Sequence, residues 1–239
     1  MSQHDNAPTA RQQSLVRAAA RALARANLVH AYGHCSLRLD ADRFLVCAAK
    51  PMGMIGPHED GTVVPVRGEL PEGVLGEVRI HQHIYRLRPE VGAVIRSMPR
   101  DVMTLSSARV TPAPRHGMGS YFSPAVPLWD DPQLVRDDDK AQAIAALLGG
   151  ARAIVMRGNG AVVAGSSIEE AAGLSFLLEE AAALELTVRA AGGGQGGTLL
   201  SDAEASARAV STGGIFERLW EFLTHGDPEQ SGSDRANIR

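Results

Sequence analysis

The stretch that most constrains the fold runs from residue 76 to residue 107 and reads GEVRIHQHIYRLRPEVGAVIRSMPRDVMTLSS. Its first apolar residues recur every three or four positions, which predicts an amphipathic helix beginning near Glu77. Pro89 ends that helix, because proline lacks the N–H that the helical ladder needs. Residues 91–95 are apolar and rich in β-branched side chains, which predicts a buried strand, and another helix is expected over residues 101–107.

The rest of the chain alternates in the same way. Helices are expected over residues 9–28, from the acidic residues 137–139 to about 148, from a capping box at 167–170 to about 190, from 201 onward, and over 215–223. Strands are expected in the second half of 28–39 and over 43–47, 62–66, 152–156 and 161–164. Strands interleaved with helices, several joined by hairpins, predict a three-layer α/β/α domain with a mainly antiparallel central sheet.

Length and composition limit the class of protein. With 239 residues, 44% of them hydrophobic, the chain can bury one full core, so we expect one domain over residues 9–224. Residues 1–8 are expected to be disordered, the glycine-rich residues 192–197 to be a flexible linker, and residues 225–239 to be a polar tail. A net charge of −3 gives no electrostatic reason to expect nucleic acid as a partner.

Compartment follows from what the sequence lacks. No apolar run approaches the ~20 residues that span a bilayer, so no membrane partner is expected. The polar N-terminus has neither the basic nor the apolar region of a signal peptide, so we expect a cytoplasmic protein. The two cysteines, Cys35 and Cys47, could face each other across a hairpin, and we interpret them as reduced core residues.

The central stretch resembles the class II aldolase and adducin family. That family has the pattern E-x-x-x-H, then a helix ending I-Y-x-x-R-P-D/E, then V-x-A-V-V-H-x-H. Glu77 and His81 match its first part, and the following positions are matched by Tyr85, Arg88, Pro89, Glu90, Ala93 and Val94. The resemblance covers roughly residues 10 to 190, and it implies the family's fold and a homotetramer with active sites at subunit boundaries.

The same resemblance places three substitutions at the family's metal site. In its aldolases, three histidines hold a zinc ion that stabilises an enediolate, and a glutamate moves the protons. Here Arg96 and Met98 stand at the two positions of H-x-H, and Asn159 replaces the third histidine. A guanidinium is a poor neighbour for a divalent cation, so we predict no cofactor at the zinc position.

The family's phosphate-binding motifs have changed as well. In Gly33–Ser36, His34 replaces the asparagine of G-N-x-S, and the T-P-S-G loop corresponds to residues 47–50, which end in Lys50. The serines before the glutamate have become Leu75 and Gly76. Because the small hydroxyl groups that would surround a phosphate are missing, we predict a small carbonyl or carboxylate substrate rather than a phosphosugar.

Four residues are candidates for catalysis. Glu77 could be a general acid and base, or only a glutamate favoured by the helix dipole. His81 could orient Glu77 by a hydrogen bond, or be a satisfied core histidine. Arg96 could bind a carboxylate or enolate oxygen, or only pair with Glu77. Lys50 could bind a carboxylate, form a Schiff base if desolvated, or be a solvated loop lysine.

Further residues are candidates for substrate binding. His34, Met98 and Asn159 are candidates because they occupy the replaced positions. His116 and Tyr121 lie in the proline-rich segment 109–134, which we interpret as a lid or a subunit-boundary loop. His83 lies far round the helix from His81 and is expected in solvent or at an interface.

Three functions remain open from the sequence. The first is a diverged, metal-independent lyase with aldolase, decarboxylase or isomerase-type enolate chemistry, in which Arg96 stabilises the negative charge and Glu77 moves the proton. The second is a non-catalytic assembly or binding protein like the adducin head. The third is an enzyme with a relocated divalent metal, held by residues such as His34, Glu77, His81 or His116.

Overall fold

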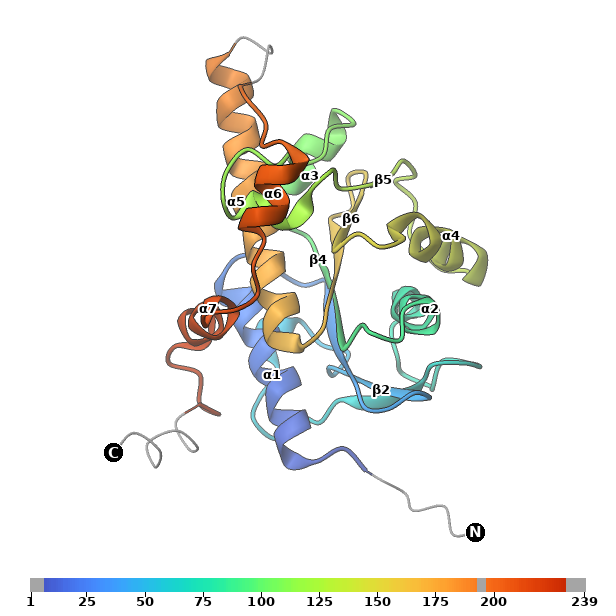
Figure 1. Cartoon of the computed structure of the whole chain (residues 1–239). Coiled ribbons are helices and arrows are strands. Elements are labelled where there is room, and N and C mark those ends of the chain that lie inside the picture. Colours follow the sequence, from blue (N-terminus) through green and yellow to red (C-terminus); the bar gives the residue numbers. More distant parts are fainter. Residues whose placement is uncertain (1–6, 193–196, 231–239) are drawn as a thin grey trace, which may run out of the picture.

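The computed structural model describes residues 7–192 and 197–230 and has one seven-stranded sheet (Figure 1). The strands are β1 (His34–Arg38), β2 (Arg43–Val46), β3 (Thr62–Pro65), β4 (Ala93–Ser97), β5 (Leu128–Trp129), β6 (Ala153–Met156) and β7 (Ala161–Gly165). Their order in space is β3-β2-β1-β4-β7-β6-β5. Every neighbouring pair is antiparallel except β5 with β6.

Helices cover both faces of this sheet (Figure 1). The helices are α1 (Ala10–Arg25), α2 (Arg79–Leu87), α3 (Arg100–Ser107), α4 (Asp138–Leu148), α5 (Ile168–Ala191), α6 (Asp202–Arg208) and α7 (Ile215–Thr224). Helices α2 and α4 pack on one face, and α1, α3 and α5 pack on the other. The α/β/α prediction with a mainly antiparallel sheet is therefore confirmed.

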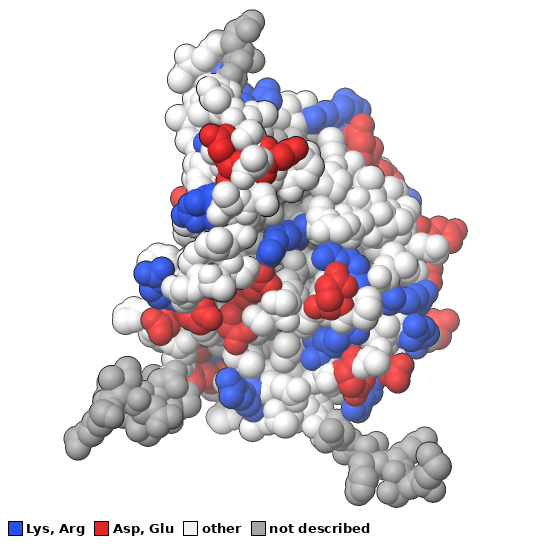
Figure 2. All heavy atoms as spheres, viewed as in Figure 1, with Lys and Arg blue, Asp and Glu red and all other residues white. Residues whose placement is uncertain are grey.

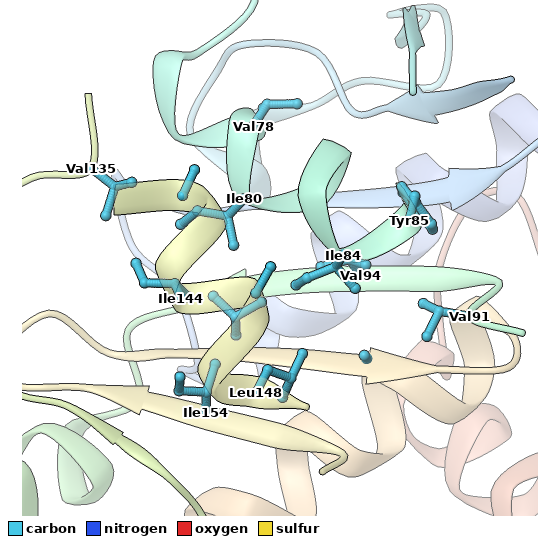
Figure 3. Close-up of a cluster of buried hydrophobic side chains, with 14 of the residues drawn as sticks. Val78, Ile80, Ile84, Tyr85, Val91, Val94, Val135, Ile144, Leu148 and Ile154 are labelled. Atoms are coloured by element: carbon cyan, nitrogen blue, oxygen red, sulfur yellow. The ribbon is translucent and has the colours of Figure 1, made fainter. Parts of the chain in front are cut away.

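The α2–α4 layer buries a continuous apolar cluster (Figure 3). Ile80 and Ile84 of α2 meet Ile144 and Leu148 of α4 over Val94 of the sheet, and all five side chains are buried. At about 1.5–3 kcal/mol for each fully buried side chain of this size, the cluster firmly fixes α2 on the sheet. Since α2 carries His81 and Tyr85, this packing also positions residues of the candidate site.

The turn between β6 and β7 brings Asn159 to the end of β4. Gly158 and Gly160 both have positive φ angles, 64° and 82°, which glycine adopts without strain. A Cβ atom on Gly160 would lie 2.0 Å from the carbonyl oxygen of Ser97, so only glycine permits this approach. The predicted hairpin over residues 157–160 is thus present, and it holds Asn159 beside Arg96.

Two sequence predictions need correction in the fold. The helix expected from Glu77 begins as a short 3₁₀ turn, Gly76–Val78, and becomes α-helical only at Arg79. The start of the expected polar tail is also part of the domain: Asp227 is fully buried, and its carboxylate accepts two hydrogen bonds from Arg21 of α1. A sequence pattern of polar residues does not reveal such a partner 206 residues away.

Other expectations fall partly outside the described residues, namely those for residues 1–6, 193–196 and 231–239. Within the described part, no helix is long and apolar enough to cross a bilayer. Acidic and basic side chains are intermixed over the face seen in Figure 2, which agrees with the near-balanced charge. Cys35 and Cys47 are both buried and free, and they lie opposite each other on the β1–β2 hairpin.

Candidate active site

Arg96 lies at the centre of the candidate site. It is in β4, its side chain is only 2% exposed, and its Nε lies 3.1 Å from Oε2 of Glu77. Its Nη2 donates a 2.7 Å hydrogen bond to Oδ1 of Asn159. The third nitrogen, Nη1, and the amide nitrogen of Asn159 are both buried without a partner among the described residues. The site therefore offers a buried cation and an amide with donors still available.

The guanidinium of Arg96 is a weaker base here than it is in water. Desolvation lowers the pKa of Arg96, and the negative charge of Glu77 partly offsets that effect. Glu77 is held in place by the 3₁₀ turn and by a 3.4 Å hydrogen bond from the backbone N–H of Val135. The sequence left two roles open for Arg96, to pair with Glu77 or to bind an oxygen of a ligand. In the structure Arg96 pairs with Glu77 and also keeps a donor for a ligand.

His81 is not turned toward Glu77. Its Nε2 lies 2.9 Å from Nδ1 of His34, and its Nδ1 lies 2.6 Å from Oγ of Ser36. Of the two alternatives left open by the sequence, His81 is thus the satisfied core histidine. Glu77 lies in the 3₁₀ turn before α2 rather than four residues back on a regular α-helix. Ser36 Oγ also lies 2.9 Å from the hydroxyl of Tyr85, so four buried side chains form one continuous hydrogen-bonded chain.

His34 and Arg96 are direct partners in the β1–β4 register, which places their side chains on the same face of the sheet. Burial, together with the neighbouring His81 and Arg96, lowers the pKa of His34 well below its ordinary value. Burial and the charge of Arg96 lower the pKa of His81 to about 3. Both imidazoles are therefore neutral at physiological pH.

A cavity of about 630 Å³ reaches His34 and Glu77, whereas Arg96, Asn159 and His81 lie behind them and are not among its lining residues. Four loops line it, through Ala31, Tyr32, Gly33, His34, Ala49, Lys50, Pro51, Leu75, Gly76, Glu77, Leu134, Val135 and Arg136. Tyr32, Leu75 and Leu134 are 69%, 42% and 49% exposed, so the cavity has an apolar lip. Its volume and mixed lining suit a small organic ligand.

Two cations stand at the outer part of the cavity. The Lys50 side chain is 53% exposed and pairs with Glu59, so it is not the desolvated amine that a Schiff base would need. Arg136 has no hydrogen bond or ion pair within the described part of the chain. Either side chain can attract a substrate carboxylate to the mouth of the cavity.

Three sequence candidates lie elsewhere in this chain. Tyr121 is buried against Phe216 of α7 with ring centroids 5.3 Å apart, and its hydroxyl donates to the carbonyl oxygen of Val210. His116 lies near Glu180 of α5, whose charge acts on it. Met98 follows β4, is partly buried and donates its backbone N–H to Leu28. None of the three lines the cavity.

His83 also differs from expectation. It is 2% exposed rather than solvated, and its Nε2 lies 3.4 Å from a carboxylate oxygen of Asp138. Helix α4 packs on α2 and covers this side of it, which the periodicity of α2 alone does not indicate.

The residues at the position that the family resemblance assigns to the metal do not fit zinc. A guanidinium and an amide face each other there, and the amide nitrogen of Asn159 is a donor that would repel a cation. No group of three histidine, cysteine, aspartate or glutamate side chains could hold a metal ion anywhere in the described residues. His34 and His81, candidates for a relocated site, instead bond to each other.

The model of the Class II Aldolase and Adducin N-terminal domain matches residues 14–186. The chain belongs to this family. Among solved structures, the class II aldolase fold is shared with l-fuculose-1-phosphate aldolase from Thermus thermophilus, at 28% identity and a TM-score of 0.70, over 80% of this chain and all of that one. An aldolase II superfamily protein from Pseudomonas syringae superimposes with a TM-score of 0.78 at 22% identity, over 97% of each chain.

Two class II aldolase relatives carry the name 3,4-dihydroxyphthalate decarboxylase. The protein from Terrabacter sp. (strain DBF63) is 29% identical over 204 residues, which cover 78% of this chain and 84% of that protein. The protein from Arthrobacter keyseri is 26% identical over 185 residues, covering 67% and 71%. The family and these names support the predicted lyase over a non-catalytic adducin-like protein.

Some residues of this class II aldolase site were not predicted. Tyr32 and Arg136 line the cavity from loops, and Ser36 and Tyr85 complete the buried chain with His81. Ser36 and Tyr85 could have been found, because both belong to family motifs quoted above. Tyr32 and Arg136 carry no motif, and only the folded arrangement brings them to one cavity.

Proposed function

We propose that this protein is a metal-independent decarboxylase of a small hydroxylated aromatic carboxylate. The observation that carries the proposal is the buried Arg96, whose guanidinium stands where the family resemblance expects metal ligands and still has a free donor. The names of the two relatives support this substrate class. The exposed ring of Tyr32 at the cavity lip offers an apolar face to an aromatic ring.

The reaction replaces a carbon–carboxylate bond with a carbon–hydrogen bond. The carboxylate of Glu77 first takes the proton of a ring hydroxyl, and that proton then goes to the ring carbon that bears the substrate carboxylate, so the hydroxyl becomes a ring ketone. The C–C bond then breaks, CO₂ leaves, and the electron pair of that bond restores the aromatic ring with a negative charge on the phenolate oxygen. In this proposal Arg96 stabilises that charge, as a fixed cation in a water-poor site can. Glu77, which lines the cavity in front of Arg96, delivers one proton to the carbon.

The test is release of CO₂ by the purified full-length chain from 3,4-dihydroxyphthalate and from mono- and dihydroxybenzoates, with and without EDTA. We expect release from at least one of these acids, unchanged by EDTA. Loss of activity in EDTA that zinc or manganese restores would overturn the metal-independent part. Cleavage of a phosphosugar, with no release of CO₂ from any aromatic acid, would overturn the decarboxylase.

A further inference from the structure

The hydrogen bonds that link the buried side chains of Tyr85, Ser36, His81 and His34 all run in one direction, from Tyr85 to His34. Burial raises the pKa of Tyr85, so its hydroxyl keeps its proton. The only side chain that bonds this hydroxyl in the described residues is Ser36, at 2.9 Å. Tyr85 therefore donates to Ser36 Oγ, and Ser36 is left to donate its own hydrogen to Nδ1 of His81 at 2.6 Å.

The same logic fixes both histidine tautomers. A neutral His81 that accepts at Nδ1 carries its hydrogen on Nε2 and donates it to Nδ1 of His34 at 2.9 Å. A neutral His34 that accepts at Nδ1 carries its hydrogen on Nε2. The Nε2 atom of His34 is buried without a partner among the described residues, and His34 lines the cavity. Every other ring nitrogen and hydroxyl oxygen of these four side chains has a hydrogen-bond partner.

The reversed direction is less favourable. It would make His81 donate to Ser36 Oγ. Ser36 would then donate either to Tyr85, whose hydroxyl hydrogen would lose its side-chain acceptor, or to the carbonyl oxygen of Val94 at 3.5 Å, a longer and weaker bond than its 2.6 Å contact with His81. A buried polar group left unpaired costs about 1–3 kcal/mol, which corresponds to a preference of about 5- to 150-fold for the direction that pairs every group.

We propose that His34 is a neutral hydrogen-bond donor that binds an oxyanion of the substrate through Nε2–H, and that Tyr85, Ser36 and His81 are positioning residues that fix its tautomer. The ligand class, a carboxylate or phenolate oxygen, rests on the proposed function. His34 does not transfer a proton in this role. It supplies a fixed dipole beside Arg96, its register partner on β4, where negative charge develops.

The tautomer can be measured without any substrate. Long-range ¹H–¹⁵N correlation spectra of histidine-labelled protein are expected to show both His34 and His81 protonated at Nε2 and neutral from pH 6 to 8. A His34 protonated at Nδ1, or a cationic His34 in this range, would overturn the proposal whatever the protein's reaction is.

A matched pair of variants tests the positioning role. Tyr85→Phe removes the hydroxyl that directs the chain, whereas Tyr121→Phe removes another buried tyrosine hydroxyl whose 2.6 Å bond goes to a backbone carbonyl outside the chain. We expect only Tyr85→Phe to give mixed His34 tautomers and to lower kcat about tenfold, with little change in KM. Equal effects of the two variants, or an unchanged tautomer in Tyr85→Phe, would contradict the role.

Ligand contact is tested with phthalate as a non-reacting probe. We expect phthalate to shift the His34 Nε2–H signal, and His34→Gln, whose amide can donate from a similar position, to keep more activity than His34→Ala. If phthalate shifts the signal but no hydroxyaromatic acid loses CO₂, the decarboxylase fails and the donor role stands. If phthalate shifts signals of other cavity residues and leaves His34 unchanged, the donor role fails.

Discussion

Arg96 and Asn159, which resemblance places at two positions of a metal site, donate and accept a direct hydrogen bond of 2.7 Å. The two residues are thus complementary to each other. A change to histidine at either position alone would leave the other residue without this hydrogen bond. Together with Glu77 they form a cation held by an amide and a carboxylate. The first prediction follows from this relationship.

Protein purified without chelator is expected to contain much less than one zinc, manganese or iron per chain. The physical reason is that a guanidinium and an amide nitrogen occupy the centre where a cation would sit. Inductively coupled plasma mass spectrometry provides the measurement. One tightly held metal per subunit would instead favour a relocated metal site.

Glu77→Gln is expected to lower kcat by about 100-fold or more, because the variant keeps the shape of the side chain but cannot transfer a proton. The fold should be retained, since the Glu77 side chain is 19% exposed at the cavity and the amide that replaces the carboxylate still places an oxygen beside Arg96. Turnover and a thermal melt of the same preparation test both parts. Full activity in this variant would remove Glu77 from the mechanism.

Arg96→Met is expected to weaken transition-state stabilisation by about 2–4 kcal/mol while the melting temperature stays unchanged or rises. A buried ion pair often contributes little net stability, so an apolar side chain of similar length is tolerated. Melts of Arg96→Met, Glu77→Gln and the double variant decide between function and structure. Large drops in both single variants, rescued in the double variant, would mean that the pair serves the fold.

Asp227→Asn is expected to destabilise the fold by about 3 kcal/mol, because it leaves the buried guanidinium of Arg21 without its main negative partner. Glu90→Gln is the matched control, since it removes a carboxylate from an exposed pair with Arg88 and should cost less than about 1 kcal/mol. Urea unfolding of both variants gives the comparison. Equal stabilities would show that residues 225–230 do not contribute to the domain.

The contact between Asp227 and Arg21 also predicts how the stability of the fold depends on pH. Burial opposes ionisation of Asp227, but the hydrogen bonds from Arg21, from the backbone N–H of Glu229 and from Arg25, together with the charge of Arg21, outweigh it, so the pKa of Asp227 lies below its ordinary value. A depressed folded-state pKa gives stability that is complete above the unfolded value of about 3.9 and is lost as the pH falls through the folded value. Wild-type stability should therefore fall more steeply than that of Asp227→Asn below about pH 4.

A homotetramer is expected in solution, on the strength of the family resemblance. The exposed Tyr32, Leu75 and Leu134 at the cavity lip are apolar surfaces that a neighbouring subunit can cover. Multi-angle light scattering at micromolar concentration gives the mass directly. A monomer that is fully active would show that the site needs no second subunit.

The sequence predicted the fold well because its signals are local. Period-three and period-two patterns located the helices and most strands, and Ser167 and Ser201 cap α5 and α6 as expected. The side chain of Glu170, expected to complete a capping box, instead bonds to Ser166 and Arg152. Ser166 lies just before the cap and Arg152 lies on a neighbouring segment, and the capping-box pattern includes neither of them.

The site was predicted less completely for the same reason. Glu77, Arg96, His34 and Asn159 were recognised and do lie together. For His81 two alternatives were left open, and its bonds to His34 and Ser36 match that of a satisfied buried histidine rather than a partner of Glu77. His116 and Tyr121 were chosen from an irregular segment whose path over α5 and α7 only the folded chain reveals.

The pairing of His34 with Arg96 across two central strands has an evolutionary consequence. Ladder hydrogen bonds on both sides hold that rung, so its geometry resists drift when the surrounding loops accept insertions or substitutions. Tyr32, Lys50 and Arg136 reach the cavity from such loops. Evolution, or a protein engineer, can therefore substitute the loop residues at the mouth of the cavity to admit a different acid while His34 and Arg96 keep their positions.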